Sequence, residues 1–437
     1  MSNRDTIFAL SSGGLPSGVA VIRLSGRQAF SIGTSLVRDL PPPRLSSLRT
    51  IRTRNGDILD QGIVIPFPGP ASFTGEDCLE LHLHGGRATV KAVLDELASF
   101  PSARHADAGE FSRRAFLNGK LDLVEIEGLA DLISAETEMQ RRLASEQARG
   151  ILSSLYTGWA QRLTHARAMI EAELDFADEE DVPGSVSAGI WEDMSALQME
   201  IDHHLAAGHA AEIIRDGLHV VIIGAPNAGK SSLLNALARR EAAIVTSVPG
   251  TTRDIISVDL SLAGFLVKLV DTAGLRETDD VVEQEGIRRA REAALSAHLI
   301  LLLSETSDGF QQIEDASAPI VRVATKIDQR RDSWNTDPTV IGLSTITGQG
   351  MENLVARLED ALPSLSGMES FSLPSRERQR DHLRQVSDAI RRSLIARQLD
   401  LQAEHLRQAA HAIGRITGKV DVEDLLDVIF SEFCIGK

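Results

Sequence analysis

The chain is poor in cysteine, in aromatic residues and in long apolar runs. Its two cysteines, Cys78 and Cys434, are too few for a disulfide scaffold and fit a reducing compartment. No apolar run approaches the roughly 18 residues that a membrane-spanning helix needs. The first residues lead directly into a strand-like segment, without the pattern of a signal peptide. We therefore expect a cytoplasmic protein that does not use a membrane.

Positive charge is also in short supply. The chain has 45 Lys and Arg against 62 Asp and Glu, which gives a net charge of −17. Phosphate neutralisation needs Lys and Arg, so this balance argues against a nucleic-acid groove along the whole chain. Local basic segments at residues 141–142 and 376–380 are more typical of solvated helix faces. If the chain acts on RNA, we expect a partner protein to supply basic surface.

The length of 437 residues and the order of the patterns predict an α/β multidomain protein. Strands and helices alternate over residues 1–120, which predicts an α+β domain. Helical periodicity follows over residues 121–175 and 188–215, and it returns over residues 376–411 and 422–433. Amphipathic helices before and after an α/β segment can bury their faces together only if that segment is inserted into one helical domain. The predicted domains are therefore residues 1–120, 121–215 with 367–437, and the inserted 216–366.

Within the N-terminal domain, residues 6–10, 18–25, 63–65 and 78–84 read as strands, and residues 27–37 and 87–100 as helices. In the strand 78–84, three leucines alternate with Glu80, His82 and His84, so the polar side chains share one face. Two histidines at this spacing can bind a metal. Without a further Cys or His cluster, we favour a polar pocket wall or simple exposure.

The strongest functional pattern is a phosphate-binding loop. The buried strand 220–223 is followed by Gly-Ala-Pro-Asn-Ala-Gly-Lys-Ser at residues 224–231 and then by a helical pattern. Glycines let backbone N–H groups surround a polyphosphate, and the helix N-terminus attracts it. Lys230 can reach the β- and γ-phosphates, and the Ser231 hydroxyl can bind Mg²⁺. The predicted contacts in this segment are Asn227, Ala228, Gly229, Lys230, Ser231 and Ser232.

Two further segments complete the expected phosphate and metal site. The strand 265–270 ends in Asp-Thr-Ala-Gly, where Asp271 can hold Mg²⁺ through water and Gly274 can donate its N–H to the γ-phosphate. In residues 250–254, Thr252 can bind Mg²⁺ only when the γ-phosphate is present, which makes this loop a switch. A polar turn before the strand 255–262 is the alternative. The predicted contacts are Thr246, Ser247, Val248, Pro249, Gly250, Thr251, Thr252, Asp271, Thr272, Ala273 and Gly274.

Base selection is expected at residues 325–328, Thr-Lys-Ile-Asp, after the apolar run 320–324. The Asp328 carboxylate can accept two hydrogen bonds from the N1–H and the exocyclic amine of guanine, so it selects GTP. GTPases usually have Asn where this chain has Thr325, and Thr cannot both donate and accept as an amide does. Lys326 belongs to the same motif. Ser344 and Thr345, after the strand 340–343, lie where a loop would cover the base.

Three catalytic roles remain open from the residues alone. Leu275 follows the Asp-x-x-Gly motif and cannot align a water, so Glu283 is our candidate, through a bridging water; a solvated helix N-terminus is the alternative. Asn227 can bind a monovalent cation, helped by carbonyls of residues 246–250, or be an ordinary turn residue. Cys434 can act as a nucleophilic thiolate, or be an inert cysteine near the end.

Together these motifs resemble the MnmE (TrmE) family of tRNA-modification GTPases, over essentially the whole chain. The resemblance rests on the phosphate loop 224–231, residues 250–254, Asp-Thr-Ala-Gly-Leu-Arg-Glu at 271–277 and the final Cys-Ile-Gly-Lys. Residues 72–77 and 111–118 match as well.

The resemblance implies an N-terminal folate-binding domain that dimerises, a helical domain and an inserted Ras-like P-loop G domain with a mixed sheet. It also implies tRNA as substrate and an FAD-dependent partner, MnmG, in a heterotetramer. The pair adds an aminomethyl or carboxymethylaminomethyl group to carbon 5 of the wobble uridine. 5-Formyltetrahydrofolate or a related reduced folate supplies the one-carbon unit. The positions matching its contacts are Arg23, Glu80, Lys120 and Lys437.

The resemblance further implies GTP hydrolysis activated by K⁺, with two G domains pairing when GTP is bound. The matching K⁺ positions are Asn227, Thr246, Val248 and Thr251, and the matching Mg²⁺ positions are Ser231 and Thr252. Glu283 matches the water-orienting glutamate, and Cys434 the cysteine of the modification chemistry. Two alternatives remain: a regulatory GTPase switch for ribosome or complex assembly, and a folate-dependent aminomethyltransferase with an acquired GTPase.

Overall fold

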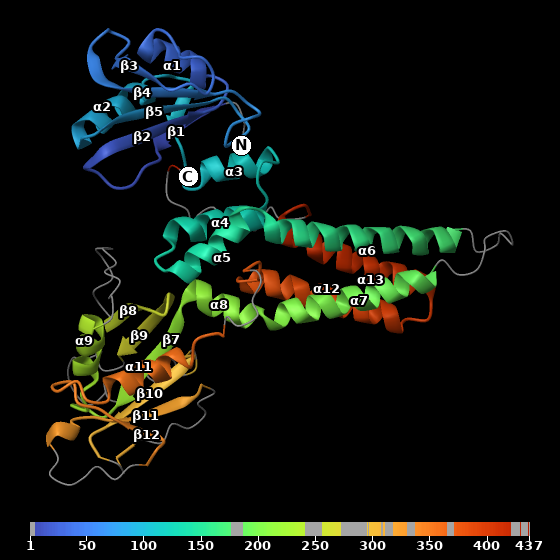
Figure 1. Cartoon of the computed structure of the whole chain (residues 1–437). Helices are drawn as coiled ribbons and strands as arrows, with labels where there is room; N and C mark the ends of the chain where they lie inside the picture. Colours follow the sequence, from blue (N-terminus) through green and yellow to red (C-terminus); the bar gives the residue numbers. More distant parts are fainter. Residues whose placement is uncertain are drawn as a thin grey trace, which may run out of the picture. The chain divides into compact units, whose positions relative to one another are not determined.

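The structure, a computed structural model, describes residues 5–175, 187–240, 256–271, 295, 297–306, 309–310, 318–329, 337–364, 371–420, 429 and 436. The chain forms two compact units (Figure 1). One unit comprises Met1–Ala130, Ser153–Thr164 and Ala410–Lys437, and the other comprises Asp131–Leu152 and His165–Ala409. Within the described ranges, no helix is both long and apolar enough to cross a membrane.

The first unit is built on a six-stranded sheet in the order β3-β4-β5-β2-β1-β6. Neighbouring strands are antiparallel except β1 and β6, which are parallel. Two helices, α1 (Ala29–Val37) and α2 (Arg87–Ala98), cover one face, where alternate strand residues such as Leu24 and Leu81 form the core. The strands are β1 (Thr6–Leu10), β2 (Ser17–Ser25), β3 (Ser47–Arg52), β4 (Ile58–Phe67), β5 (Cys78–Gly85) and β6 (Ala103–His105).

The opposite face of this sheet carries polar side chains. The register aligns Ala9 with Arg23 and Arg23 with Glu80. Residues directly opposite each other in an antiparallel pair share a face of the sheet. Phe111, from helix α3 (Glu110–Leu117), packs on Ala9 at this face. The fold therefore places Arg23 and Glu80 side by side, away from the core under α1 and α2.

The helical segments before and after residues 216–366 contact each other within the second unit. The Ser387 hydroxyl donates to Asp202 at 2.6 Å, and the Gln147 amide donates to the carbonyl of Leu373 at 3.0 Å. The insertion hypothesis requires such contacts, although the domain boundaries themselves stay a prediction. The helices are α4 (Leu123–Ser134), α5 (Glu138–Ala148), α6 (Ile151–Asp175), α7 (Ser187–Ala206), α8 (Gly208–Asp216), α12 (Glu377–Ile395) and α13 (Leu399–Thr417).

Several expected elements are divided or were missed. The helical stretch over 121–175 forms three helices, because Thr137 caps the start of α5 and Gly150 has a φ of +74°. The stretches over 188–215 and 376–411 each form two helices. Strands β3 and β6 and helix α3 were not predicted from patterning. The helix expected over 422–433 lies almost entirely outside the described residues.

The second unit contains a six-stranded sheet in the order β12-β11-β10-β7-β9-β8. All neighbours are parallel except β8, which runs antiparallel to β9 at the edge. This is the strand order of a Ras-like G domain, as predicted, with one antiparallel strand making the sheet mixed. The strands are β7 (Leu218–Gly224), β8 (Ile256–Leu262), β9 (Phe265–Asp271), β10 (Leu299–Ser304), β11 (Ile320–Ala324) and β12 (Val340–Gly342).

Helices α9 (Lys230–Arg240) and α11 (Met351–Glu359) bury Leu237 and Leu354 against one face of this sheet. Parallel strands end at the same edge, and open α/β sheets bind ligands at the carboxyl ends of their strands. Here that edge collects the phosphate loop after β7, Asp271 on β9, Thr325 after β11 and the loop after β12. The topology alone therefore gathers motifs that are far apart in the sequence.

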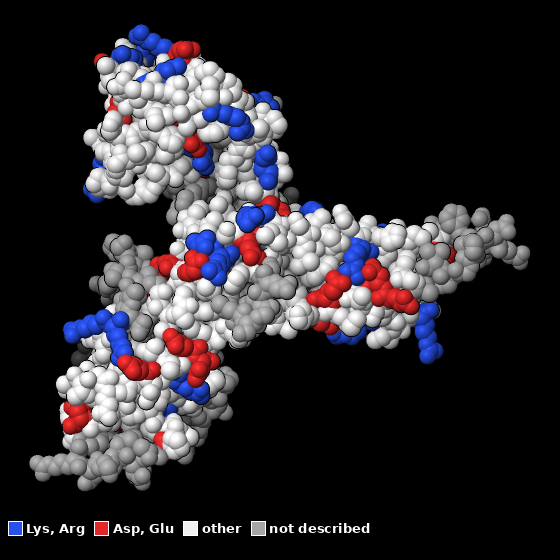
Figure 2. All heavy atoms as spheres, in the orientation of Figure 1, with Lys and Arg blue, Asp and Glu red and all other residues white. Residues whose placement is uncertain are grey.

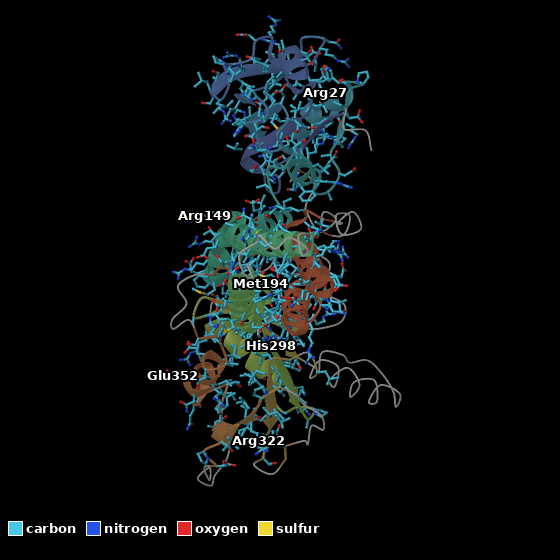
Figure 3. The ribbon with its side chains drawn as sticks, turned by 90° about the vertical axis from the view of Figure 1, so that its right-hand side faces the viewer. Arg27, Arg149, Met194, His298, Arg322 and Glu352 are labelled. Atoms are coloured by element: carbon cyan, nitrogen blue, oxygen red, sulfur yellow. The ribbon has the colours of Figure 1, made fainter. Side chains whose placement is uncertain are left out.

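His298, labelled in Figure 3, connects the start of β10 to β7. Its backbone N–H donates to the carbonyl of His219 at 2.9 Å, and its Nδ1 accepts the His219 N–H at 3.0 Å. Burial lowers the pKa of His298, which agrees with the neutral ring that an accepting Nδ1 requires. These two hydrogen bonds between His219 and His298 hold β7, the strand that leads into the phosphate loop, against the start of β10.

Candidate functional site

The phosphate loop joins β7 to α9 as the sequence predicts. Asn227 and Gly229 adopt positive φ angles of +66° and +88°. Such angles suit glycine and are tolerated by asparagine. The Ala228 N–H donates to the carbonyl of Ala225 at 3.1 Å, so the loop closes on itself before the helix begins. Asn227 is exposed at this turn.

Lys230 lies inside the loop. Its side chain is buried, and Nζ donates to the carbonyls of Gly224 at 2.6 Å and Ala225 at 2.9 Å. These carbonyl oxygens hold the ammonium at the centre of the loop. Phosphate oxygens are stronger partners for an ammonium group than neutral carbonyls, because the hydrogen bonds are charge-assisted. The position is therefore the one from which Lys230 can reach a bound polyphosphate.

The side chains of Ser231, at the start of α9, and Asp271, at the end of β9, are hydrogen-bonded to each other. The Ser231 hydroxyl donates to Oδ2 of Asp271 at 3.1 Å, and Asp271 is buried at the end of β9. Mg²⁺ prefers oxygen ligands and commonly binds through one or two protein oxygens, with phosphates and waters completing its shell. A hydroxyl and a carboxylate at this distance fit that chemistry. The two residues predicted to share the metal are thus adjacent.

The base-recognition motif follows β11. Thr325 is buried, and its hydroxyl donates to the carbonyl of Ala228 in the phosphate loop at 2.8 Å. Asp328 is exposed in the short 3₁₀ helix η1 (Ile327–Gln329). Lys326 forms an ion pair with Glu305. The motif is therefore attached to the phosphate loop at Thr325, while the Asp328 carboxylate faces solvent, where a base can reach it.

The loop after β12 lies beside this motif. Ser344 is fully buried, and its carbonyl accepts the N–H of Gly348 at 2.9 Å. The carbonyl of Leu343 accepts the N–H of Ile327 at 3.3 Å, which joins the two loops. A cavity of about 580 Å³ lies between α9 and this loop, and both Ser232 and Thr345 line it. The structure thus brings these predicted contacts to one side of the site.

The remaining predicted residues of the nucleotide site are not among those that the structure describes. Their roles stay predictions. They are Thr246, Ser247, Val248, Pro249, Gly250, Thr251, Thr252, Thr272, Ala273, Gly274 and Glu283.

A second polar cluster lies on the N-terminal sheet. Arg23 Nη2 is 2.9 Å from Glu80 Oε1, and His82 Nε2 is 3.2 Å from the other oxygen of Glu80. The Arg23 guanidinium also lies over the rings of Phe73 and Phe111, with centroids 5.1 and 5.8 Å away. A guanidinium, a carboxylate and aromatic rings can together hold a flat ligand that has both donors and acceptors.

The two histidines of β5 behave differently. His82 joins Glu80 in the polar cluster, whereas His84 is largely exposed and pairs with Asp60 at 2.8 Å. Among the described residues there is no group of three or more His, Cys, Asp or Glu that could hold a metal ion. Because His82 contacts Glu80, its position fits the wall of a polar pocket. The position of His84 fits simple exposure to solvent.

Lys120 and Gly436 also have neighbours in the N-terminal domain. A Cβ on Gly75, whose φ is +80°, would lie 3.3 Å from Lys120 Cγ, so Lys120 lies beside the loop that carries Phe73. Gly436 accepts a hydrogen bond from the Ser11 hydroxyl at 2.8 Å at the end of β1. A Cβ there would fall 2.1 Å from the Leu10 carbonyl oxygen, so this position requires glycine. Cys434 and Lys437 lie outside the described residues.

Sequence reasoning missed Phe73, Phe111 and Ser304. The two rings lie within the matched segments 72–77 and 111–118, but no local pattern shows that both face Arg23. The Ser304 carbonyl accepts the Thr325 N–H at 2.9 Å and becomes visible only when β10 and β11 are paired. Such contacts depend on strand register, which the sequence does not display.

Surface charge of both signs is dispersed on the face drawn in Figure 2. Lys and Arg side chains are scattered among neutral and acidic ones, and the described residues on this face form no continuous basic strip. The basic segment 141–142 shows this arrangement, because Arg141 and Arg142 both pair with Glu138 at 2.8 Å. These arginines belong to an ion-paired helix face, as expected.

Comparisons with known proteins cover nearly the whole chain. Residues 6–120 match the family described as the GTP-binding protein TrmE N-terminus, and residues 123–434 match the MnmE helical domain. Proteins named tRNA modification GTPase MnmE from Rhizobium meliloti and Sinorhizobium medicae are each 65% identical, over 100% of both chains. The protein of that name from Agrobacterium fabrum is 54% identical over 99% of both chains. With both family segments matched and relatives similar over their full length, the chain belongs to the MnmE (TrmE) family.

Proposed function

We propose that this chain is a GTP hydrolase that acts in the modification of the tRNA wobble uridine. One observation carries the proposal: the carboxyl edge of one sheet brings together Lys230, the pair Ser231 and Asp271, and the base motif. These are the parts that phosphoryl transfer from a nucleotide needs. The full-length relatives named tRNA modification GTPase supply the link to tRNA.

In this proposal, Lys230 neutralises the β- and γ-phosphates, and Ser231 with Thr252 holds Mg²⁺, with Asp271 acting through water. Mg²⁺ supplies charge neutralisation at the oxygens of the transferred group. Asn227, with Thr246, Val248 and Thr251, holds K⁺, and Glu283 orients the attacking water. The exposed turn at Asn227 supports the K⁺ assignment, because a cation bound at an exposed turn is accessible to a second G domain.

The N-terminal cluster is proposed to bind a reduced folate such as 5-formyltetrahydrofolate. Glu80 offers a carboxylate to the donor edge of a pterin, and Arg23 offers a guanidinium that lies over the Phe73 ring. Lys120 and Lys437 add positive charge for the glutamate tail of the folate. The folate supplies the one-carbon unit, and an FAD-dependent MnmG-type partner takes part in adding the aminomethyl or carboxymethylaminomethyl group. A homodimer and a heterotetramer with that partner complete the assembly.

Cys434 provides the test of this function. In a strain that lacks the native gene, the wild-type chain is expected to restore the modified wobble uridine, measured by mass spectrometry of tRNA nucleosides. Cys434→Ser is expected to lose that modification and to keep GTP hydrolysis in vitro. Cys78→Ala is the matched control, because it removes the other thiol, which is buried in β5.

The outcomes separate the proposal from a regulatory GTPase switch. A switch that only assembles complexes has no use for the thiol, so unchanged modified-uridine levels in Cys434→Ser would favour it. Normal tRNA nucleosides in the deletion strain itself would remove the link to tRNA and favour a folate-dependent aminomethyltransferase.

A further inference from the structure

Thr325 occupies the position where most GTPases have asparagine, and its hydroxyl has a defined partner. Oγ1 donates to the carbonyl of Ala228 at 2.8 Å, and the next acceptor, the carbonyl of Ser304, is 3.4 Å away. The backbone N–H of Thr325 donates to the same Ser304 carbonyl at 2.9 Å. The side chain is only 3% exposed, so water does not compete for these contacts.

The partner of this hydroxyl belongs to the phosphate loop. Ala228 directly precedes Gly229, whose φ of +88° turns the loop into α9. A Cβ on Gly229 would lie 3.7 Å from Thr325 Cβ, so Thr325 lies beside this part of the loop. Residues that are 97 positions apart are thus joined by a buried hydrogen bond. A loop held at this point keeps its N–H groups aimed at the phosphates.

The single hydroxyl proton of Thr325 limits the hydrogen bonds that its side chain can donate. A threonine hydroxyl has one proton, whereas an asparagine amide has two. Here the proton goes to the Ala228 carbonyl at a normal hydrogen-bond distance. The imidazole edge of guanine presents N7, which is an acceptor and requires a donor. Thr325 therefore has no proton left for the base.

We propose that Thr325 is a positioning residue that braces the phosphate loop and makes no hydrogen bond to guanine. Guanine recognition by this motif then rests on the Asp328 carboxylate, as the exposed position of that side chain allows. The inference rests on the proposed GTP site and adds to it, because it separates the residue that shapes the loop from the residue that reads the base.

The test compares GDP with 7-deaza-GDP, in which a C–H group replaces N7. Binding is measured by calorimetry on the full chain for the wild type, Thr325→Val and Thr325→Ser. Valine has nearly the same shape as threonine and lacks the hydroxyl, whereas serine keeps it. Thr325→Val is expected to weaken both nucleotides by the same factor, about tenfold, because it leaves a buried carbonyl without its donor. Thr325→Ser is expected to restore binding to within about threefold of the wild type.

Two results would overturn the inference. The first is that Thr325→Val binds GDP as tightly as the wild type does, which would show that the Thr325 hydroxyl does not brace the phosphate loop. The other is a preference of the wild type for GDP over 7-deaza-GDP that disappears in Thr325→Val, which would show that the hydroxyl contacts N7. A wild-type chain that binds neither nucleotide would instead contradict the proposed function. Thermal unfolding without nucleotide checks that all variants are folded, and the serine variant provides the comparison if valine is not tolerated.

Discussion

Asp328 is the residue through which this site is expected to read its base. It is exposed, whereas the neighbouring Thr325 is buried against the phosphate loop. A carboxylate accepts hydrogen bonds only, which fits the two donors on the N1 edge of guanine. An amide at the same position would also donate a hydrogen bond. Xanthine, the base of XDP, carries a carbonyl acceptor where guanine carries its amine, so an amide would suit xanthine better.

We therefore expect Asp328→Asn to weaken GDP binding by about a hundredfold, the size of two lost hydrogen bonds to a charged group. The same variant is expected to bind XDP more tightly than the wild type does. Fluorescent nucleotide titrations measure both affinities. Asp360→Asn is the control, since Asp360 is exposed beyond the end of α11. Equal GDP affinity in the wild type and Asp328→Asn would remove Asp328 from base recognition.

His204, on helix α7, gives a second prediction for a single residue. Burial lowers its pKa from 6.5 to about 4, and the positive charge of neighbouring His203 adds to the effect. The unfolded chain therefore binds a proton at His204 at a higher pH than the folded chain does. The contribution of the neutral ring to stability is complete above pH 6.5 and is lost progressively as the pH falls towards 4.

The free energy of unfolding of the wild type is thus expected to fall by up to about 3 kcal/mol from this residue between pH 7 and pH 4. Urea titrations at several pH values give this slope. His204→Leu is expected to show a shallower slope over the same range, because leucine does not titrate. His203→Gln, at an exposed neighbouring position, is expected to keep most of the wild-type slope. Parallel slopes for the wild type and His204→Leu would contradict the assignment.

Among the elements, helix α5 and the β8–β9 hairpin form the most informative contact. The Met139 N–H donates to the carbonyl of Gly264, in the hairpin turn, at 3.1 Å. The Met139 side chain is buried in a cluster with Leu143 and Phe265. The hairpin begins just after the predicted switch loop 250–254 and ends at Asp271. Helix α5 is therefore attached to the two strands that connect the predicted switch loop 250–254 to Asp271.

Met139→Ala is expected to lower the free energy of unfolding by about 2–3 kcal/mol, because it removes buried side-chain volume from this contact. Met199→Ala, at a position 65% exposed on α7, is the matched control and is expected to change it by less than about 0.5 kcal/mol. Chemical denaturation measures both. Similar effects of the two substitutions would mean that the α5–hairpin contact adds no stability.

Elements also show how far sequence patterning reached. The strand before the phosphate loop and the helix after it were predicted correctly, because a buried apolar run and its glycine-rich turn are local. The helical stretch over 121–175 was not predicted as three helices. Its breaks depend on the cap at Thr137 and the positive φ of Gly150, which interrupt the helices without changing their apolar spacing.

For the whole molecule, the proposed K⁺ activation concerns two copies of the chain. Asn227 is exposed in a turn with positive φ, as a cation site shared with a second G domain would require. Replacing Na⁺ by K⁺ at equal ionic strength is expected to raise GTP turnover on the order of tenfold, because a cation between the phosphates stabilises the developing charge as an arginine finger does.

Phosphate release assays give turnover, and light scattering gives the mass in each salt with a non-hydrolysable GTP analogue. K⁺ is expected to increase the paired form. Asn227→Gly, which removes the amide and suits the positive φ of this turn, is expected to lose the difference between the two salts. The same turnover in Na⁺ and K⁺ would contradict this role of Asn227.

The sequence by itself determined the parts of this protein that depend on consecutive residues: the phosphate loop, the strands and helices on either side of it, the base motif and the family. Local spacing is enough for these, because a strand, its turn and the following helix need no distant partner. The tertiary structure decided which side chains meet. Ser231 reaches Asp271 over 40 positions, Arg23 reaches Glu80 over 57, and Thr325 reaches Ala228 over 97. These contacts follow from strand order and register, which set distances between residues that the linear chain leaves independent.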